Sequence, residues 1–233
     1  SGNLGGAEKA APDQHGTAMG AVVASNIGIA PNAKLAFVSL PANTALAAPE
    51  AKFDAAVTQG ANIIVSGAGA AATAYNSASA SVDAFLARQP LTLAIFAAGN
   101  SATQLSGPGY SKNALVVGST NIGPNRHIIG GASPVSGTKD YRFKPDIVAS
   151  GDGLSLPCGA AMGTSVAAAA AAGAAALARQ YYSEGYYPGG APDDILSFIP
   201  TGALLKATLI HSGVDASAVQ RNGGIDGAGA SPS

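Results

Sequence analysis

The segment Gly159–Tyr182 ("GAAMGTSVAAAAAAGAAALARQYY") places the hydroxyl of Ser165 at the head of a run made almost wholly of alanine and glycine. The run predicts a helix, and the first turn of a helix offers unpaired N–H groups and the positive end of the helix dipole. Because developing negative charge is stabilised there, Ser165 is a candidate nucleophile. The same hydroxyl could instead cap the helix or lie in the core.

Two further side chains could take part in such chemistry. His15 stands at the start of a helix-like segment, "DQHGTAMGAVVA", and Asn100 follows an apolar strand in "IFAAGN". An imidazole can take the proton of a serine hydroxyl, and an amide N–H can hold an oxyanion. Each also has an ordinary interpretation, as a hydrogen-bonded structural histidine and as a turn asparagine. His127 and His211 have no motif around them, and we interpret them as structural.

The composition indicates one globular domain. The chain has 233 residues, of which 47% are hydrophobic and 11% are charged, which is enough to bury one core. A net charge of −1 provides no basic surface for nucleic acid or for an anionic membrane. The longest apolar run starts at Val166 and stops at Arg179, short of the ~20 residues that span a bilayer. The single cysteine, Cys158, excludes an internal disulfide.

Hydrophobic periodicity predicts strands that alternate with helices. We expect helices at His15 and at Ser165, and further elements as follows: strands over 33–40, 61–67, 91–99 and 113–120, and helices over 49–60, 77–89 and 200–213. Apolar strands separated by helices predict an α/β fold, a three-layer, doubly wound, mainly parallel sheet with helices on both faces. We expect one domain over residues 1–213 and a Gly-rich polar tail or linker over 214–233.

Three short blocks resemble the subtilisin-like serine proteases, the subtilases. They are His15-Gly16-Thr17, the block from Ala97 to Asn100, and Gly163-Thr164-Ser165, and they follow the family's order. "IGIAPNAKL" and "FKPDIVASG" are similar to two further family segments, so the resemblance runs from about His15 to Ser212. "RQYYSEGYYPGG" and "GALLKATLIHSG" look closest to the large subtilases that carry a β-sandwich after the catalytic domain.

The resemblance implies a serine endopeptidase that cleaves polypeptides, with Ser165 as nucleophile, His15 as general base and Asn100 as oxyanion donor. It also implies a buried serine-bearing helix, whose small side chains let its neighbours approach closely, and an extracellular or secretory location. The implied substrate-binding residues lie in two segments: Ser66, Gly67, Ala68, Ala97, Ala98 and Gly99. Calcium is the one cofactor that the resemblance suggests, and no loop is dense enough in carboxylates to name its ligands.

The sequence departs from the family pattern at several places. The family's triad aspartate lies on a strand well before the histidine, whereas fourteen residues precede His15 here. Asp13 is the sole upstream candidate for that carboxylate, and it is too near on the same loop to face the imidazole from another strand. The family's Ser-x-Gly is "SGAG", its proline four residues after the nucleophile is Ala169, and its substrate-binding edge is shortened to "LPANTALAAP". The family's closing Gly-aromatic-Gly-Arg-type segment is absent.

Two functional hypotheses follow. In the first, residues 1–213 are a subtilisin-like catalytic domain, incomplete at the N-terminus, of an active endopeptidase; a missing N-terminal segment or another chain completes the fold. In the second, the chain is a catalytically impaired subtilase fold that serves as a structural or interaction module in a larger assembly. His15, Asn100 and Ser165 together favour the first hypothesis. The trimmed loops and the missing strand favour the second.

Overall fold

A computed structural model describes residues 2–3, 14–38, 50–123, 127–130, 132–135, 137–156 and 159–214. Asp13, Cys158, the segment "LPANTALAAP" and the predicted tail beyond residue 214 lie outside these residues.

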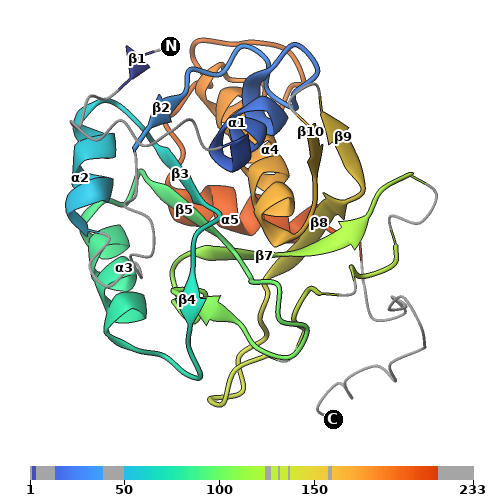
Figure 1. Cartoon of the computed structure of the whole chain (residues 1–233). Coiled ribbons are helices and arrows are strands. Elements are labelled where there is room, and N and C mark those ends of the chain that lie inside the picture. Colours follow the sequence, from blue (N-terminus) through green and yellow to red (C-terminus); the bar gives the residue numbers. More distant parts are fainter. Residues whose placement is uncertain are drawn as a thin grey trace.

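A four-stranded parallel sheet forms the centre of the fold (Figure 1). Its strands, in spatial order, are β3 (Ile63–Ser66), β5 (Leu93–Ala97), β7 (Leu115–Asn121) and β8 (Ile147–Asp152). The first three coincide with strands predicted from the sequence, and the predicted α/β fold with a mainly parallel sheet is confirmed. The sequence analysis did not predict β8, because its residues "IVASGD" contain neither an apolar run nor a regular alternation.

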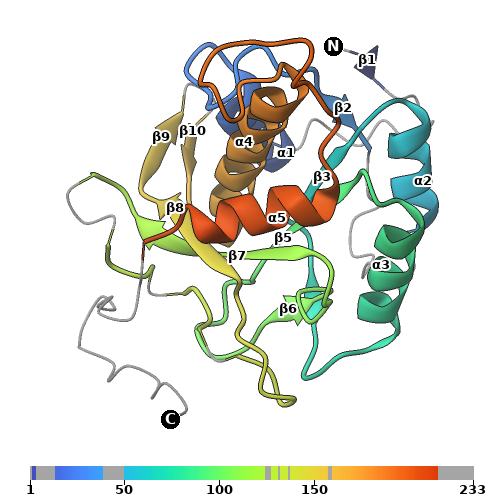
Figure 2. The ribbon, with the colours of Figure 1, turned by 180° about the vertical axis from the view of Figure 1, so that it is seen from behind.

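Helices cover both faces of this sheet (Figures 1 and 2). The helices are α1 (Gln14–Ala24), α2 (Glu50–Thr58), α3 (Ser77–Arg88), α4 (Thr164–Ser183) and α5 (Gly202–His211). Leu93 and Ile95 of β5 pack with α1, α4 and α5, whereas Phe96 packs with Phe53 of α2 and Phe85 of α3. Since successive side chains of a strand point to opposite faces, burial on both faces explains why β5 is apolar throughout.

The strand predicted over 33–40 is described only to residue 38. Within 33–38 the strand residues are β2 (Ala36–Phe37), which pairs in parallel with β1 (Gly2–Asn3) rather than with the main sheet. Two antiparallel pairs complete the strands: β4 (Ala70–Ala71) with β6 (Ser106–Gly107), and β9 (Leu154–Leu156) with β10 (Gly159–Ala161). Among the described residues, β3 therefore has a strand partner, β5, on one side only.

The alanine-rich run forms α4, which lies between α1 and the sheet. Ala167, Ala168 and Ala169 have no exposed surface. A methyl group built on Gly173 would lie 2.7 Å from Cβ of Ile29, so the turn after α1 touches the helix backbone. Small side chains are therefore what allow the neighbours of α4 to approach it.

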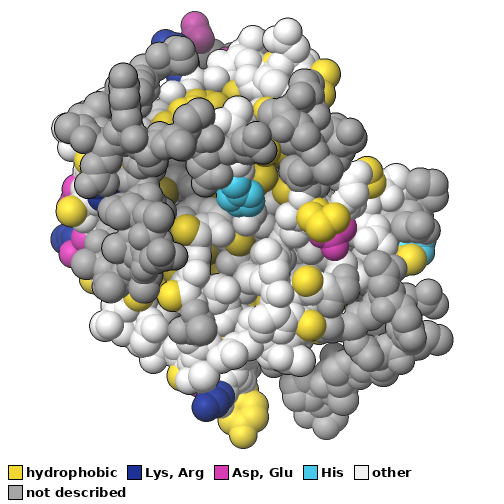
Figure 3. All heavy atoms as spheres, viewed as in Figure 1, with side chains coloured by type: hydrophobic (Ala, Val, Ile, Leu, Met, Phe, Trp, Pro, Cys, Tyr) yellow, Lys and Arg dark blue, Asp and Glu magenta, His cyan; other side chains and the backbone are white. Residues whose placement is uncertain are grey.

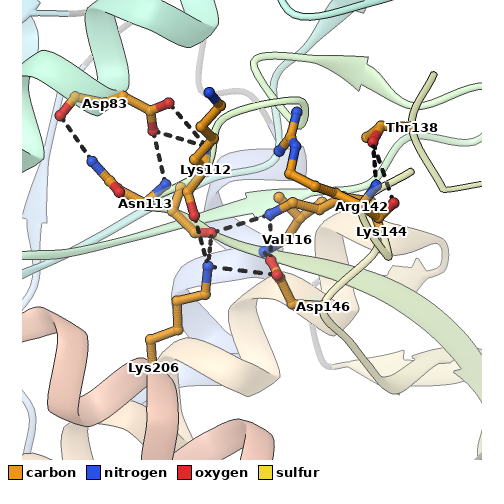
Figure 4. Close-up of polar contacts among 10 residues, drawn as sticks. Asp83, Lys112, Asn113, Val116, Thr138, Arg142, Lys144, Asp146 and Lys206 are labelled. Carbon is orange, nitrogen blue, oxygen red and sulfur yellow. Dashed lines mark hydrogen bonds and ion pairs between the residues drawn. The ribbon is translucent and has the colours of Figure 1, made fainter. Parts of the chain in front are cut away.

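A buried ion pair joins β8 to β7 and α5 (Figure 4). The Asp146 carboxylate accepts hydrogen bonds from Lys144 Nζ (2.6 Å) and from the Val116 N–H (2.7 Å), and Lys206 Nζ of α5 lies 3.5 Å from its second oxygen. Lys206 Nζ also donates to the Ala114 carbonyl at 2.9 Å. Burial lowers the pKa of Lys144 from 10.5 to about 8, because desolvation of the ammonium outweighs the attraction of Asp146.

We predict that the free energy of unfolding rises with pH above pH 8 because of Lys144. The folded protein loses this proton near pH 8, while the unfolded chain keeps it to about 10.5, so the unfolded state binds more protons in between. The rise from this group should reach at most about 1.4 kcal/mol per pH unit. Urea unfolding between pH 7.5 and 9.5 should show a steeper rise for the wild type than for Lys144→Met. Equal slopes would show that Lys144 keeps its proton in this range.

Candidate active site

Ser165 lies in the first turn of α4, one residue after its first residue. The N-cap is Gly163, with φ of +100°, and no side chain caps the helix, so Ser165 is not a capping hydroxyl. Ser165 is 6% exposed as a residue, and its Oγ donates to the Gly67 carbonyl at 3.3 Å. The N–H groups of Val166 and Ala167 are directed to the Gly163 carbonyl, while the Ser165 N–H has no hydrogen-bond partner within the described part of the chain.

Gly67, just after β3, is the point at which Ser165 and His15 meet. A methyl group built on Gly67 would lie 2.8 Å from Ser165 Oγ and 3.4 Å from His15 Nε2. Both side-chain atoms therefore lie within 3.4 Å of one position at the carboxyl end of β3. His15 is exposed at the start of α1, and α1 packs against α4. The structure thus brings together two residues that are far apart in the sequence.

Asn100 is held against the first turn of α4 by Thr164. Its side-chain oxygen accepts hydrogen bonds from the Thr164 N–H and Oγ1, both at 3.0 Å, and the buried Thr164 Oγ1 also accepts the Gly99 N–H at 3.0 Å. This arrangement leaves Nδ2 of Asn100 without a hydrogen-bond partner among the described residues. The sequence analysis missed the role of Thr164, because only the tertiary contact shows that it fixes the asparagine amide.

Asp152, at the end of β8, is a second residue that the sequence analysis missed. Its carboxylate accepts the Gly163 N–H at 2.8 Å, and the Gly151 carbonyl shares that N–H at 3.0 Å. A methyl group built on Gly163 would lie 2.9 Å from Oδ1 of Asn100. Gly163 is therefore fixed between β8 and Asn100, and this contact sets where α4 begins.

The two segments predicted to bind substrate follow neighbouring strands. Ser66 pairs with Phe96 in the register of β3 and β5, so the segment around Gly67 and the segment up to Gly99 leave the sheet side by side. The Ala68 N–H donates to Ser66 Oγ at 3.2 Å and shapes the first segment. In the second segment Ala97 and Ala98 are buried, and the exposed surface begins at Asn100.

The face of the molecule over α1 and α4 carries few charged side chains, and a histidine side chain stands near its centre (Figure 3). His127 and His211 are also exposed, and His211 ends α5.

The described ranges contain no group of three or more His, Cys, Asp or Glu side chains that could hold a metal ion. Within those ranges, the helices are all too short or too polar to cross a bilayer.

The fold and the convergence of a serine, a histidine and an asparagine define the class of subtilisin-like serine proteases. The chain matches the subtilase family over residues 4–229, and it belongs to that family.

Three known proteins illustrate the similarity. The chain is 34% identical over 109 residues to the serine protease/ABC transporter B family protein tagB of Dictyostelium discoideum. The matched region is 38% of this chain and 6% of that protein. It resembles the prenylagaramide maturation protease PagA (24% identity, TM-score 0.61, 78% of this chain and 68% of that one). It also resembles a cold-adapted subtilisin-like serine proteinase, with 19% identity and a TM-score of 0.63. The match covers 84% of this chain and 67% of that one. The two structures support the fold alone.

We predict that Gly67→Ala destabilises the folded chain by about 1–3 kcal/mol, the usual range for inserting a methyl group into a packed site. The new methyl group would clash with Cβ and Oγ of Ser165 at 2.8 Å. Gly189→Ala is the matched control, because a methyl group there meets nothing within 4 Å. Urea unfolding of the two variants measures the difference. An equal effect of both substitutions would show that Ser165 moves aside without cost.

Proposed function

We propose that this chain is the catalytic domain of a serine endopeptidase, with Ser165 as nucleophile and His15 as general base. The convergence of Ser165 Oγ and His15 Nε2 on one position beside Gly67 carries the proposal. The site faces the carboxyl end of a parallel sheet, where ligands of α/β proteins usually bind. Family membership supports the same chemistry.

In the proposed reaction, Ser165 Oγ attacks the carbonyl carbon of a peptide bond while its proton passes to His15 Nε2. The carbonyl oxygen becomes an oxyanion, and it is held by the unpaired Ser165 N–H and by Nδ2 of Asn100. His15 then gives the proton to the leaving amine as the C–N bond breaks. Water, activated by His15, hydrolyses the acyl-enzyme and returns Ser165 to its hydroxyl form.

The position of Ser165 supports this chemistry electrostatically. The peptide dipoles of α4, a helix of twenty residues, are aligned, and its positive end stabilises negative charge beside the first turn, where Ser165 lies. Neither the Ser165 N–H nor the side-chain amide of Asn100 has to be reoriented to bind the oxyanion. The N–H of Ser165 and Nδ2 of Asn100 have no hydrogen-bond partner among the described residues, while Oδ1 of Asn100 is held by Thr164.

The proposed mechanism also requires a carboxylate that orients the imidazole of His15. Asp152 lies close to the start of α4, but its carboxylate binds the Gly163 N–H, and we assign it no role toward the imidazole. Asp13 lies outside the described residues. We propose that a segment outside the described residues or another chain supplies this group. We also propose a polypeptide substrate and an extracellular or secretory location, which family membership supports.

The second candidate function is that of an impaired subtilase fold used as an interaction module. The open side of β3 favours it, because no described strand pairs with β3 on the side away from β5, next to the proposed site.

Labelling with a fluorophosphonate probe tests the proposed enzyme. We expect Ser165 of the wild-type chain to react and Ser165→Ala not to react, and mass spectrometry of the labelled peptide identifies the modified residue. A site of this type that lacks an orienting carboxylate loses about 10⁴ in turnover, so samples are taken over both short and long incubations. If labelling is equal in both proteins, or lies on another serine, the protease proposal fails and the interaction module takes its place.

We predict that Asn100→Ala lowers kcat for peptide hydrolysis by about 10²–10³ and leaves KM nearly unchanged. The amide would contact the substrate oxygen mainly once charge develops, so its loss should affect the transition state. Because Asn100 also accepts the Thr164 N–H, Asn100→Asp is the informative companion variant, since it keeps an oxygen acceptor but loses the donor. A full rate in Asn100→Asp would remove the amide donor from the mechanism.

A further inference from the structure

A short segment between α4 and α5 exposes large apolar side chains. Residues 194–199 are all exposed, and four of these six are large and apolar. Ile195 is 92% exposed and Ile199 is 59% exposed. Apolar side chains that gather on a surface in this way usually mark an interaction site. We call residues 184–199, which contain this surface, the knob.

Contacts with the end of α4 hold the knob in place. The Phe198 N–H donates to the Tyr182 carbonyl at 3.2 Å, and the rings of Phe198 and Tyr187 both pack against the ring of Tyr182. The Asp193 N–H donates to the Glu184 carbonyl at 3.1 Å and folds the segment back on itself. The exposed side chains therefore stand on a support that is part of the folded domain.

A second exposed apolar surface stands on a turn of chain that we call the hairpin, residues 137–144. The Gly137 N–H donates to the Lys144 carbonyl at 3.0 Å and closes it. Tyr141 is 96% exposed and Phe143 is 78% exposed. The hairpin therefore presents two aromatic rings to solvent.

Tyr141 has a backbone conformation that does not suit a tyrosine. Its φ is +61°, in the left-handed region that glycine adopts freely and residues with larger side chains rarely adopt. Since the ring is exposed, its burial does not compensate for this strain. Neither the backbone nor the core of the chain favours a tyrosine at this position, whereas a contact with a partner would.

The two surfaces differ in charge. The knob contains three carboxylates and no Lys or Arg: Glu184, Asp193 and Asp194. The hairpin and the charged residues around its base (Figure 4) include more cations than carboxylates, namely Lys112, Lys139, Arg142, Lys144 and Lys206 against Asp83, Asp140 and Asp146. Of these cations, Lys112 and Lys139 are exposed. An acidic apolar surface and a basic aromatic surface are complementary.

We propose that the knob of one copy of the chain binds the hairpin of a second copy, so that copies associate head to tail. Figures 1 and 2 both show the two segments at opposite ends of the molecule, the knob (orange) at the top and the hairpin (yellow) at the bottom. A contact between unlike surfaces leaves one of each kind free, so it continues from copy to copy or closes a ring. This inference does not rest on the proposed function.

Sedimentation velocity of the whole chain tests for association. We expect a weight-average mass that exceeds the 22.5 kDa of one copy and rises with concentration between about 1 µM and about 1 mM, the range of weak protein interfaces. A mass that stays at 22.5 kDa throughout this range would overturn the proposal and leave the two surfaces to a different partner.

One substitution on each surface locates the contact. We expect Tyr141→Gly and Ile195→Ser each to weaken association by about tenfold or more, as expected for apolar anchors of an interface. Tyr141→Gly should do so without lowering the free energy of unfolding, because glycine adopts this φ without strain. Met162→Ser, at a position that is 69% exposed just before Gly163, is the control and should associate like the wild type. Association that neither substitution weakens would lie elsewhere and overturn the proposal.

A mixture of the two weakened variants tests the head-to-tail arrangement. Tyr141→Gly keeps an intact knob and Ile195→Ser keeps an intact hairpin, so the mixture can form one native contact although neither variant can do so alone. We expect a 1:1 complex in the mixture, with both variants folded by circular dichroism. No complex in the mixture, or a wild-type dimer that only one of the substitutions abolishes, would show contact between like surfaces and contradict the arrangement.

A charge reversal tests the electrostatic part of the contact. We expect Lys139→Glu on the hairpin to weaken association by about threefold or more, the effect of an exposed ion pair. Lys34→Glu makes the same change of net charge at an exposed position outside both surfaces and should have a smaller effect. Equal effects of the two reversals would show that net charge alone governs association, and the assignment of the hairpin by its charge would fail.

Discussion

The close approach of neighbouring backbone to the first turn of α4 is the constraint on which the site depends. At Gly67, Gly151 and Gly163, an added methyl group would lie less than 3.0 Å from another atom, and the atoms it would meet belong to Ser165, Gly163 and Asn100. The end of β3, the end of β8 and the start of α4 can therefore converge only where side chains are missing. The alanine run extends the same condition along the first part of the helix, where most residues up to Ala175 are buried.

The contacts at the two edges of the sheet, β8 and β3, differ. At the β8 edge, Asp146 joins the strand to β7, and Lys206 attaches α5 to the same carboxylate. At the β3 edge, the described residues provide a cavity between β3 and β2 in place of a strand. Among the described residues, β8, like β3, has a strand partner on one side only. Asp152 at the end of β8 binds the Gly163 N–H at the start of α4, whereas Gly67 at the end of β3 lies beside Ser165 Oγ and His15 Nε2.

The sequence predicted those parts of the fold that have a local signal. β5 and β7 are continuous apolar runs, and α3 and α5 have helical periodicity, so their positions were correct to within about two residues. β8 was missed because "IVASGD" acquires its strand conformation from pairing with β7. Ser165, His15 and Asn100 lie in contiguous motifs, and the structure places them around one end of the sheet. The contacts of Thr164, Asp152 and Gly67 depend on residues distant in sequence, which no local pattern shows.

The hydrogen bonds of Thr164 divide the candidate site into two mechanical parts. Thr164 ties Gly99 and Asn100 to the helix that carries Ser165, so the end of β5 and the start of α4 move as one body. His15 lies outside this hydrogen-bonded unit, on α1, which packs against α4. In the proposed reaction, a displacement of α1 relative to α4 would change the distance between His15 and Ser165 and leave the hydrogen bonds between Thr164 and Asn100 in place.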